Sequence, residues 1–486
     1  MTPETLRAGA EPGRAAPLFS LGDVVAATGG RLLAGDPRAA LGGVALDTRA
    51  VCGGDLFCAI RGERVDAHRL LPAAVAAGAA AVLVDRSPGD GWSLDGLPAP
   101  RGAVLVPSVA TALARLAIAH LARLPVRVAA VTGSVGKTGT RTLIAAALGA
   151  GGQEVLAAQD SFNTEWTVPL VCLRAGPQHA FAALELAMRG RGEIAYLAEV
   201  CRPEVGVLTV IGESHLEALG SVEAIIAAKG ELVAGLPPDG VAVLNRDDPR
   251  QAALSARAPC RVLGYGLAPG AEVRATAVAV GPSGSTFTAV LRGRRFPVRL
   301  QLLGAHQVGN ALAALACADA MGVPVDAAAE ALSHVRAWQS RLQVRDFGRI
   351  RVLDDAYNAA PQSTVAALQV LATQAPVAAR AAVLGDMLEL GAAADAGHAR
   401  VGRVAAEIGM RWLLTVGALA AGIARAAVAG GMPASSVFVV KDQAGVAALL
   451  PKLLCPDLTV LVKGSRAVGL EDTVAAIAAW GQGDHS

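Results

Sequence analysis

The run TGSVGKT at residues 132–138 most constrains how this chain can fold. It follows the apolar run VRVAAV, which is typical of a buried strand, and it precedes GTRTLIAAAL, which is typical of a helix. A glycine turn in that place directs backbone N–H groups and a helix N-terminus at an anion, which predicts a phosphate loop. The alternative is a glycine turn without a ligand. The loop is a shortened variant, because Val131 stands where the long motif has its first glycine.

The phosphate-loop interpretation assigns a task to each polar group of the loop. Lys137 would reach the terminal phosphates of a nucleotide such as ATP, and Thr138 would place its hydroxyl on Mg²⁺. We expect these residues to bind the nucleotide: Thr132, Gly133, Ser134, Val135, Gly136, Lys137 and Thr138.

Strand-like and helix-like runs alternate along the whole chain, and they predict an α/β protein of three domains. Residues 1–107 predict a small α/β domain. Residues 108–335 predict a central nucleotide-binding domain with a mainly parallel sheet and a β-rich insertion at residues 274–304. Residues 336–486 carry successive strand signals between Ala-rich helices, which predicts a doubly wound, Rossmann-like domain. A length of 486 residues agrees with several cores rather than one.

Composition excludes several classes of protein. The 43 basic and 41 acidic residues give a net charge of +2 without a basic stripe, so neither nucleic acid nor an anionic membrane is an expected partner. The longest apolar stretch, residues 70–84, is shorter than the roughly 20 residues that a membrane span needs. Seven scattered cysteines show neither zinc spacing nor a disulfide framework, which indicates a reducing cytoplasm.

Two further expectations concern the N-terminus and the oligomeric state. The first 17 residues have no apolar core of the signal-peptide type and predict a short loose tail. We expect a monomer, because no long heptad pattern is evident.

Lysine is rare in this chain, with five among the 43 basic residues. Arginine therefore serves wherever a generic positive charge is sufficient, and each lysine invites a specific explanation. Lys229, in the helical run EAIIAAKGELVAGL, has two interpretations. It is either a lysine on the exposed face of an amphipathic helix, or an amine needed for chemistry that a guanidinium cannot perform.

Two polar residues follow strand-like runs of the central region. Glu185 ends the run FAALE, where a parallel sheet presents functional residues and a carboxylate can bind Mg²⁺. His215 lies in GESHLE after the run VGVLTVIG. A lone histidine is more often a structural or surface residue, and the residues alone favour that alternative over a functional role.

Five separated stretches together resemble the Mur ligases of peptidoglycan synthesis. LDTRAVCGGDLFCAI with VDAH resembles the uridine-nucleotide domain, TGSVGKT the ATP loop, and ELAMRGRGEIAYLA with GESHLEALGSVEAIIAAKGEL the metal region. HQVGNALAA and the span from DDAYNAAP to VKGSR complete the match, which covers nearly the whole chain. DDAYNAAP is the most diagnostic stretch. The chain lacks the DNPR sequence of the relative that adds diaminopimelate as third amino acid.

The resemblance implies a role for each candidate residue. Thr138, Glu185 and His215 would bind divalent ions, and Lys137, Lys229 and His215 would be catalytic. Lys229 would be carbamylated by CO₂, which turns the amine into an anion able to hold a second Mg²⁺. Further ATP contacts would come from Asn310, Arg341, Asp355 and Tyr357, and substrate contacts from Thr48, Arg49, Asn163 and Lys463.

The implied reaction joins D-alanyl-D-alanine to UDP-N-acetylmuramoyl-tripeptide through an acyl phosphate, with ATP as the energy source. Alternatives are a related ligase with another amino-acid acceptor, a folate-type glutamate ligase, a nucleotide-dependent regulatory protein and an inactive homologue. The DTR…GGDLF region argues against the folate type. The chain departs from the family pattern at Ala67, Thr164, Thr167, Ala187 and Ala356, and these departures affect the expected substrate contacts near Asn163 more than the ATP chemistry.

Overall fold

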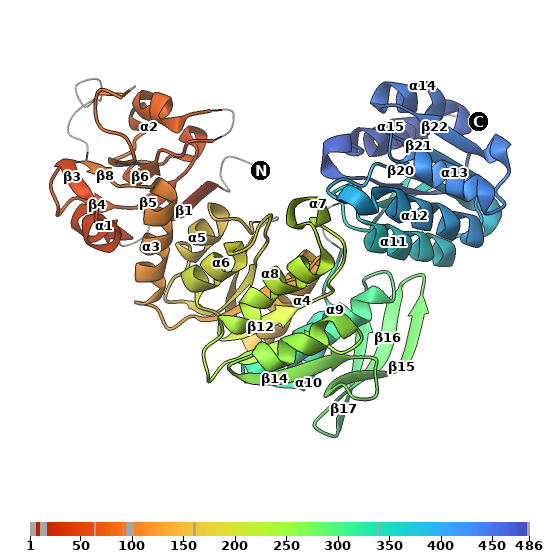
Figure 1. Ribbon diagram of the computed structural model, residues 1–486, viewed down its shortest axis with the longest axis horizontal. Coiled ribbons are helices and arrows are strands. Elements are labelled where there is room, and N and C mark those ends of the chain that lie inside the picture. Colours follow the sequence, from red (N-terminus) through yellow and green to blue (C-terminus); the bar gives the residue numbers. More distant parts are fainter. Residues whose placement is uncertain are drawn as a thin grey trace.

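The computed structural model describes residues 6–9, 17–62, 65–90, 92–93, 102–158, 162–337 and 340–483. Its elements form three lobes arranged in an arc, each built on a large sheet of its own (Figure 1). The predicted α/β class and the three-part architecture are confirmed. The domain boundaries after residues 107 and 335 stay predictions.

The N-terminal lobe contains a six-stranded sheet in the order β1-β5-β6-β7-β8-β3. Strands β5 to β8 are parallel, and β1 and β3 close the two edges in antiparallel orientation. Its strands are β1 (Arg7–Gly9), β3 (Arg31–Ala34), β5 (Gly43–Ala45), β6 (Asp55–Cys58), β7 (Ala81–Val84) and β8 (Gly102–Leu105), with a ribbon of β2 (Phe19–Ser20) and β4 (Ala40–Leu41). Its helices are α1 (Leu21–Thr28) and α2 (Leu71–Ala76), and α3 (Val109–Leu121) leads out of it.

The expectation of a loose N-terminal tail is wrong for residues 6–9. Arg7 to Gly9 form the edge strand β1, and the Arg7 guanidinium binds both carboxylate oxygens of Asp55 at 2.6 and 2.9 Å. Asp55 is fully buried. A buried ion pair therefore helps to hold this strand, which lacks the apolar pattern that normally indicates a strand in a sequence. Of the other residues of the expected tail, 1–5 and 10–16 lie outside the described residues, and residue 17 is described.

The central lobe contains a nine-stranded sheet in the order β10-β11-β9-β12-β13-β14-β15-β16-β17. The first seven strands are parallel, and the predicted insertion at residues 274–304 extends this same sheet with antiparallel strands rather than forming a separate unit. The strands are β9 (Arg127–Thr132), β10 (Glu154–Ala157), β11 (His179–Glu185), β12 (Val205–Leu208), β13 (Val241–Asn245), β14 (Arg261–Gly266), β15 (Val273–Gly281), β16 (Gly284–Leu291) and β17 (Arg294–Leu300). The helices are α4 (Lys137–Leu148), α5 (Thr167–Cys172), α6 (Glu193–Cys201), α7 (Leu216–Leu219), α8 (Val222–Ala234), α9 (His306–Ala320) and α10 (Val325–Ser333).

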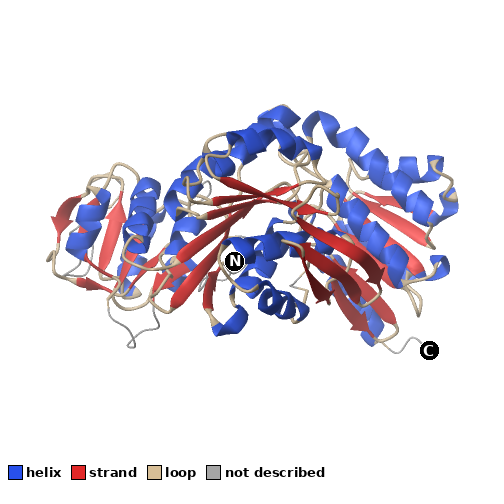
Figure 2. Ribbon diagram, turned by 90° about the horizontal axis from the view of Figure 1, so that it is seen from below, coloured by secondary structure: helices blue, strands red, loops and turns tan. Residues whose placement is uncertain are grey.

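The C-terminal lobe is doubly wound, as predicted, with strand order β18-β19-β23-β20-β21-β22. One face of its sheet packs against helices α11 to α13 and the other against α14 and α15, so that the sheet lies between two helical layers (Figure 2). The strands are β18 (Gln343–Phe347), β19 (Ile350–Asp354), β20 (Arg380–Gly385), β21 (Trp412–Val416), β22 (Val437–Val440) and β23 (Thr459–Lys463). The helices are α11 (Pro361–Gln374), α12 (Ala394–Ile408), α13 (Ala421–Ala429), α14 (Gln443–Leu453) and α15 (Glu471–Gln482). Across the described part of the chain, no helix is both long enough and apolar enough to span a membrane.

The three lobes are joined in two different ways. Helix α3 packs on α1 in the N-terminal lobe and on α5 and α6 in the central lobe, and one continuous hydrophobic core runs through both lobes. His120 at the end of α3 stacks edge-on against Phe19 and binds the carbonyl oxygen of Ala175 at 2.8 Å. The C-terminal lobe has cores of its own, to which the central lobe contributes Leu303. The N-terminal and central lobes therefore form one body, and the C-terminal lobe docks on it.

Candidate active site

The phosphate loop lies where the sequence predicted it, between β9 and the first residue of α4. Two of its glycines are sterically required. A Cβ on Gly133 would come within 1.9 Å of the Thr209 hydroxyl, and Gly136 has a φ of +89°. Thr209, which directly follows β12, supports the loop, because its hydroxyl donates to the carbonyl of Val135 at 2.6 Å. These contacts with Thr209 hold the loop in shape.

Two lysines meet at this loop. The Nζ atoms of Lys137 and Lys229 both donate to the carbonyl oxygen of Gly133, at 2.9 and 3.0 Å. Lys229 is 1% exposed, which excludes the interpretation as a surface lysine of an amphipathic helix. Burial, together with the positive charge of Lys137, places the pKa of Lys229 well below its usual range. This arrangement favours a neutral amine at Lys229.

The phosphate loop also lies in the field of groups from other elements. Burial lowers the pKa of Lys137, and the nearby charges of Glu185, Arg341 and Glu389 modify that shift in both directions. Arg341 and Glu389 belong to the C-terminal lobe. The central and C-terminal lobes therefore both contribute charged groups near the phosphate loop.

Thr138 and Glu185, two of the predicted metal ligands, are in direct contact. The Thr138 hydroxyl donates to one carboxylate oxygen of Glu185 at 2.7 Å, and the Asn163 amide donates to the other at 2.8 Å. Glu185 is 2% exposed. A buried carboxylate beside a hydroxyl at a phosphate loop suits Mg²⁺, which takes few protein oxygens and shares the phosphates. In the described ranges, no three His, Cys, Asp or Glu residues form a group able to hold a metal.

His215 makes a contact that the sequence did not predict. It precedes α7 with a φ of +67°, and its Nδ1 lies 2.8 Å from a carboxylate oxygen of Glu389 in the C-terminal lobe. No contact joins it to Glu185 among the hydrogen bonds of the described residues. A metal-binding or catalytic role for His215 therefore stays a prediction.

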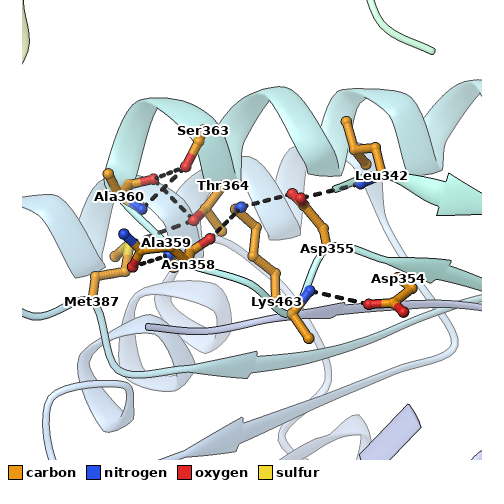
Figure 3. A network of polar contacts seen from close by, with 11 residues as sticks. Leu342, Asp354, Asp355, Asn358, Ala359, Ala360, Ser363, Thr364, Met387 and Lys463 are labelled. Atoms are coloured by element: carbon orange, nitrogen blue, oxygen red, sulfur yellow. Dashed lines mark hydrogen bonds and ion pairs between the residues drawn. The ribbon is translucent and has the colours of Figure 1, made fainter. Parts of the chain in front are cut away.

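Lys463 and Asp355 form a buried pair at the carboxyl ends of β23 and β19 (Figure 3). The ammonium group lies 2.6 Å from Asp355 and donates to the carbonyl oxygen of Asn358 at 2.7 Å. The other carboxylate oxygen of Asp355 accepts from the backbone of Leu342 at 3.2 Å. Lys463 is 3% exposed, so its side chain holds the loop after β19 in place. Substrate contact by Lys463 stays a prediction.

Tyr357, in the same loop, lies beneath a guanidinium. Arg341 is 4.2 Å from the centre of its ring, and Arg466, which the sequence did not single out, is 4.9 Å away. The predicted ATP contacts Arg341, Asp355 and Tyr357 are thus grouped at the edge of the sheet where doubly wound folds bind ligands.

Asn310 approaches the phosphate loop from α9. Its side-chain oxygen accepts from the Thr140 hydroxyl at 3.1 Å, and a Cβ on Gly136 would lie 3.0 Å from the same oxygen. Its amide donates to Gln307 at 2.9 Å. Asn310 is therefore placed at the start of α4, as a predicted nucleotide contact requires.

The predicted uridine contacts lie in the N-terminal lobe, in a short turn at Thr48–Ala50 that begins at Asp47. The Arg49 side chain is exposed and pairs with Asp47 at 2.7 Å. The structure does not bring Thr48 or Arg49 into contact with the phosphate loop. Their roles stay predictions.

The residues near Asn163 that depart from the family pattern form a local turn. The backbone N–H of Thr164 donates to the Thr167 hydroxyl at 3.0 Å, just where α5 begins, and Ala187 donates its N–H to the carbonyl of Asn163 at 2.9 Å. Asn163 contacts Glu185 in this chain. These substitutions therefore leave the oxygen groups beside the loop in position.

Sequence reasoning missed three residues of this site: Thr209, Glu389 and Arg466. Thr209 follows the apolar run of β12, the same strand-end position that drew attention to Glu185, and that signal could have found it. Glu389 and Arg466 lie in loops of the C-terminal lobe, and only the fold brings them to the site.

Family models match three parts of the chain: "Mur ligase family, catalytic domain" at residues 41–121, "Mur ligase middle domain" at 131–318, and "Mur ligase, glutamate ligase domain" at 340–466. The UDP-N-acetylmuramoyl-tripeptide–D-alanyl-D-alanine ligase of Escherichia coli (strain K12) is 34% identical over 90% of this chain and 94% of its own length.

Two solved structures are similar over nearly all of the fold. MurF from Acinetobacter baumannii has a TM-score of 0.83 at 28% identity and covers 95% of this chain and 99% of its own. MurF ligase from Thermotoga maritima in complex with ADP has a TM-score of 0.78 at 26% identity and covers 90% and 97%. The phosphate loop, the lysine pair and these likenesses agree, and the chain belongs to the Mur ligase family.

Proposed function

We propose that this chain is the ATP-dependent ligase that joins D-alanyl-D-alanine to UDP-N-acetylmuramoyl-tripeptide in the synthesis of peptidoglycan precursors. The observation that carries the proposal is the phosphate loop on whose Gly133 carbonyl Lys137 and Lys229 converge, beside the contact of Thr138 with Glu185. Relatives that bear this ligase name align over about nine-tenths of the chain and support the choice of substrates.

The first chemical step is formation of an acyl phosphate. The terminal carboxylate of the tripeptide attacks the γ-phosphorus of ATP, a new O–P bond forms, and the bond to ADP breaks. Lys137 and the loop N–H groups stabilise the negative charge that develops on the phosphoryl oxygens. Thr138 and Glu185 would hold Mg²⁺, which supplies further neutralisation of that charge.

The second step forms the amide. The free amine of D-alanyl-D-alanine attacks the activated carbonyl, and a tetrahedral intermediate collapses with release of phosphate and of the amine proton. Docking of the C-terminal lobe over the loop would exclude water, which would otherwise hydrolyse the acyl phosphate. We further propose that the enzyme acts in the cytoplasm as a monomer, as the sequence predicts.

Lys229 is the proposed site of carbamylation. A neutral amine adds through its lone pair to the carbon of CO₂, so that an N–C bond forms, one C=O electron pair moves to oxygen, and the amine loses a proton. The buried position of Lys229 beside Lys137, which places its pKa well below the usual range, supports this chemistry. The resulting carbamate would add an anion where the described residues offer no cluster of three acidic or histidine groups.

The carbamate can be tested with Lys229→Ala. We expect ligation to fall at least 10³-fold, about 4 kcal/mol of transition-state stabilisation, with partial recovery when formate or acetate supplies the missing carboxylate. Intact-mass spectrometry of the wild-type enzyme in bicarbonate should show an added CO₂ that Lys229→Ala lacks. Full activity of Lys229→Ala would remove the carbamate from the mechanism.

The test of the function itself is phosphate release from ATP with Mg²⁺, UDP-N-acetylmuramoyl-tripeptide and D-alanyl-D-alanine, each omitted in turn. We expect phosphate only when all are present, with one ligated product per ATP. Turnover with a different acceptor would keep the family and overturn the substrate. Binding of the UDP-tripeptide without any turnover would favour an inactive homologue or a regulatory protein.

A further inference from the structure

The loop after β20 contacts the central lobe through the side chain and the backbone of Glu389. The carboxylate of Glu389 lies 2.8 Å from Nδ1 of His215, and its carbonyl oxygen accepts from the N–H of Glu217 at 3.4 Å. Two residues further on, a Cβ at Gly391 would come within 3.0 Å of Cα of Glu217. This short loop therefore sits directly against the start of α7.

The two residues in contact share an uncommon backbone conformation. His215 has a φ of +67° and Glu389 a φ of +63°, in the left-handed region that residues with a side chain adopt at a cost of roughly 1 kcal/mol or more each. Such conformations persist where the surrounding contacts fix them. Here each of the two residues makes a contact with the other lobe.

The base of the Glu389 loop is tied to the strand end that carries Lys463. Leu388 donates its N–H to the Ser465 hydroxyl at 2.9 Å, and Ser465 donates its N–H to the carbonyl of Asp386 at 3.0 Å. The loop therefore moves with the edge of the sheet at which Asp355 and Lys463 pair. A displacement of the C-terminal lobe would carry all of these groups together.

The Glu389 carboxylate also lies within the field of the phosphate loop. Its pKa is lowered first by the hydrogen bond with His215 and then by the charges of His215, Arg189 and Lys137. Leu303 is the residue that the central lobe adds to the cores of the C-terminal lobe, so polar contacts of this kind contribute to how the two lobes align.

We infer that Glu389 is a positioning residue that couples docking of the C-terminal lobe to the orientation of His215 beside the phosphate loop. The carboxylate holds the imidazole ring through Nδ1 and leaves Nε2 outside this contact. Its kinetic consequence rests on the proposed function, whereas the contact itself does not.

Hydrogen exchange of the whole protein tests the contact without any substrate. In Glu389→Gln and Glu389→Ala, we expect amide exchange in the segment at residues 213–220 to accelerate severalfold, because the loop that protects Glu217 is loosened. Glu389→Asn removes the carboxylate but places a residue that tolerates the left-handed conformation at this position, so an effect of this variant is not due to backbone strain. Glu407→Gln, an exposed carboxylate on α12 of the same lobe, is the matched control and should leave the segment unchanged. Unchanged exchange in every Glu389 variant would overturn the inference.

Kinetics separate positioning from mere support of the fold. We expect Glu389→Ala to lower kcat roughly tenfold, the scale of one charge-assisted hydrogen bond, while KM for ATP changes less than threefold. In a His215→Ala background, the same substitution should have almost no further effect on kcat. Independent, multiplying losses in the double variant would overturn the coupling. Faster exchange in an enzyme that shows no ligase turnover would keep the contact and remove the proposed function.

Discussion

Two lysines of this protein are buried to the same degree and have opposite surroundings. Lys463 is 3% exposed and lies 2.6 Å from the carboxylate of Asp355 (Figure 3). Lys229 is 1% exposed, binds the carbonyl oxygen of Gly133 at 3.0 Å, and has another lysine as its charged neighbour. A buried ammonium with a carboxylate is compensated, whereas a buried ammonium beside a second cation is not.

This difference indicates what each lysine is for. The pair at Lys463 fixes the loop after β19, so its positive charge is part of the structure. At Lys229 the surroundings disfavour the charged form, because burial and the charge of Lys137 lower its pKa. Burial alone therefore does not distinguish the surroundings of the two lysines, and the charge of the nearest neighbour does.

The largest expected effect is that of Lys229→Arg. A guanidinium cannot lose its proton, so the substitution forces a permanent charge into a buried position whose charged neighbour is Lys137. We expect a loss of about 3 to 5 kcal/mol in the free energy of unfolding, together with loss of ligation. Urea unfolding followed by circular dichroism measures the first and phosphate release the second.

The matched control for that substitution is Lys441→Arg. Lys441 is exposed at the end of β22, and the change there should stay within about 0.5 kcal/mol. A stable and active Lys229→Arg enzyme would contradict both the prediction that a charge at this position is uncompensated and the proposed carbamate.

Lys463→Met should be destabilising by a different mechanism. The substitution leaves the Asp355 carboxylate buried without its cation, and we expect a loss of about 3 kcal/mol in the free energy of unfolding of the C-terminal lobe. The fluorescence of the buried Trp412 reports on this lobe. The double variant Lys463→Met with Asp355→Asn should regain at least half of the loss, because no unpaired charge remains. Equal stability of the single and double variants would show that the pair is not coupled.

The sequence predicted the frame of the site well because its signals are local. The apolar run, glycine turn and helix at residues 127–148 follow one another in the chain, and parallel strands place Glu185 and Thr138 at the same edge of the sheet. The scarcity of lysine directed attention to Lys229, which is buried at the phosphate loop. The helix around it is apolar on nearly every side, so periodicity could not indicate whether the lysine was buried.

The sequence failed where two distant loops or termini meet. Glu389 contacts His215, and Arg7 pairs with Asp55, across separations that no periodic pattern records. The edge strand at Arg7 has no apolar alternation, because a buried ion pair and backbone hydrogen bonds hold it. Contacts between lobes depend on how complete domains dock, which local spacing does not determine.

The smallest expected effect is on the pH dependence of stability, and it concerns Lys229 alone. In the unfolded chain a lysine keeps its proton up to a pKa of about 10.4, whereas folded Lys229 releases it at lower pH. Between these two pKa values the unfolded state binds more protons, so the free energy of unfolding should rise with pH, by at most about 1.4 kcal/mol per pH unit. Lys229→Met removes the titrating group, and its stability measured by urea unfolding in CO₂-free buffer should rise less steeply over the same range. Parallel curves for the wild type and Lys229→Met would mean that folded Lys229 keeps its proton, and the contrast with Lys463 would then disappear.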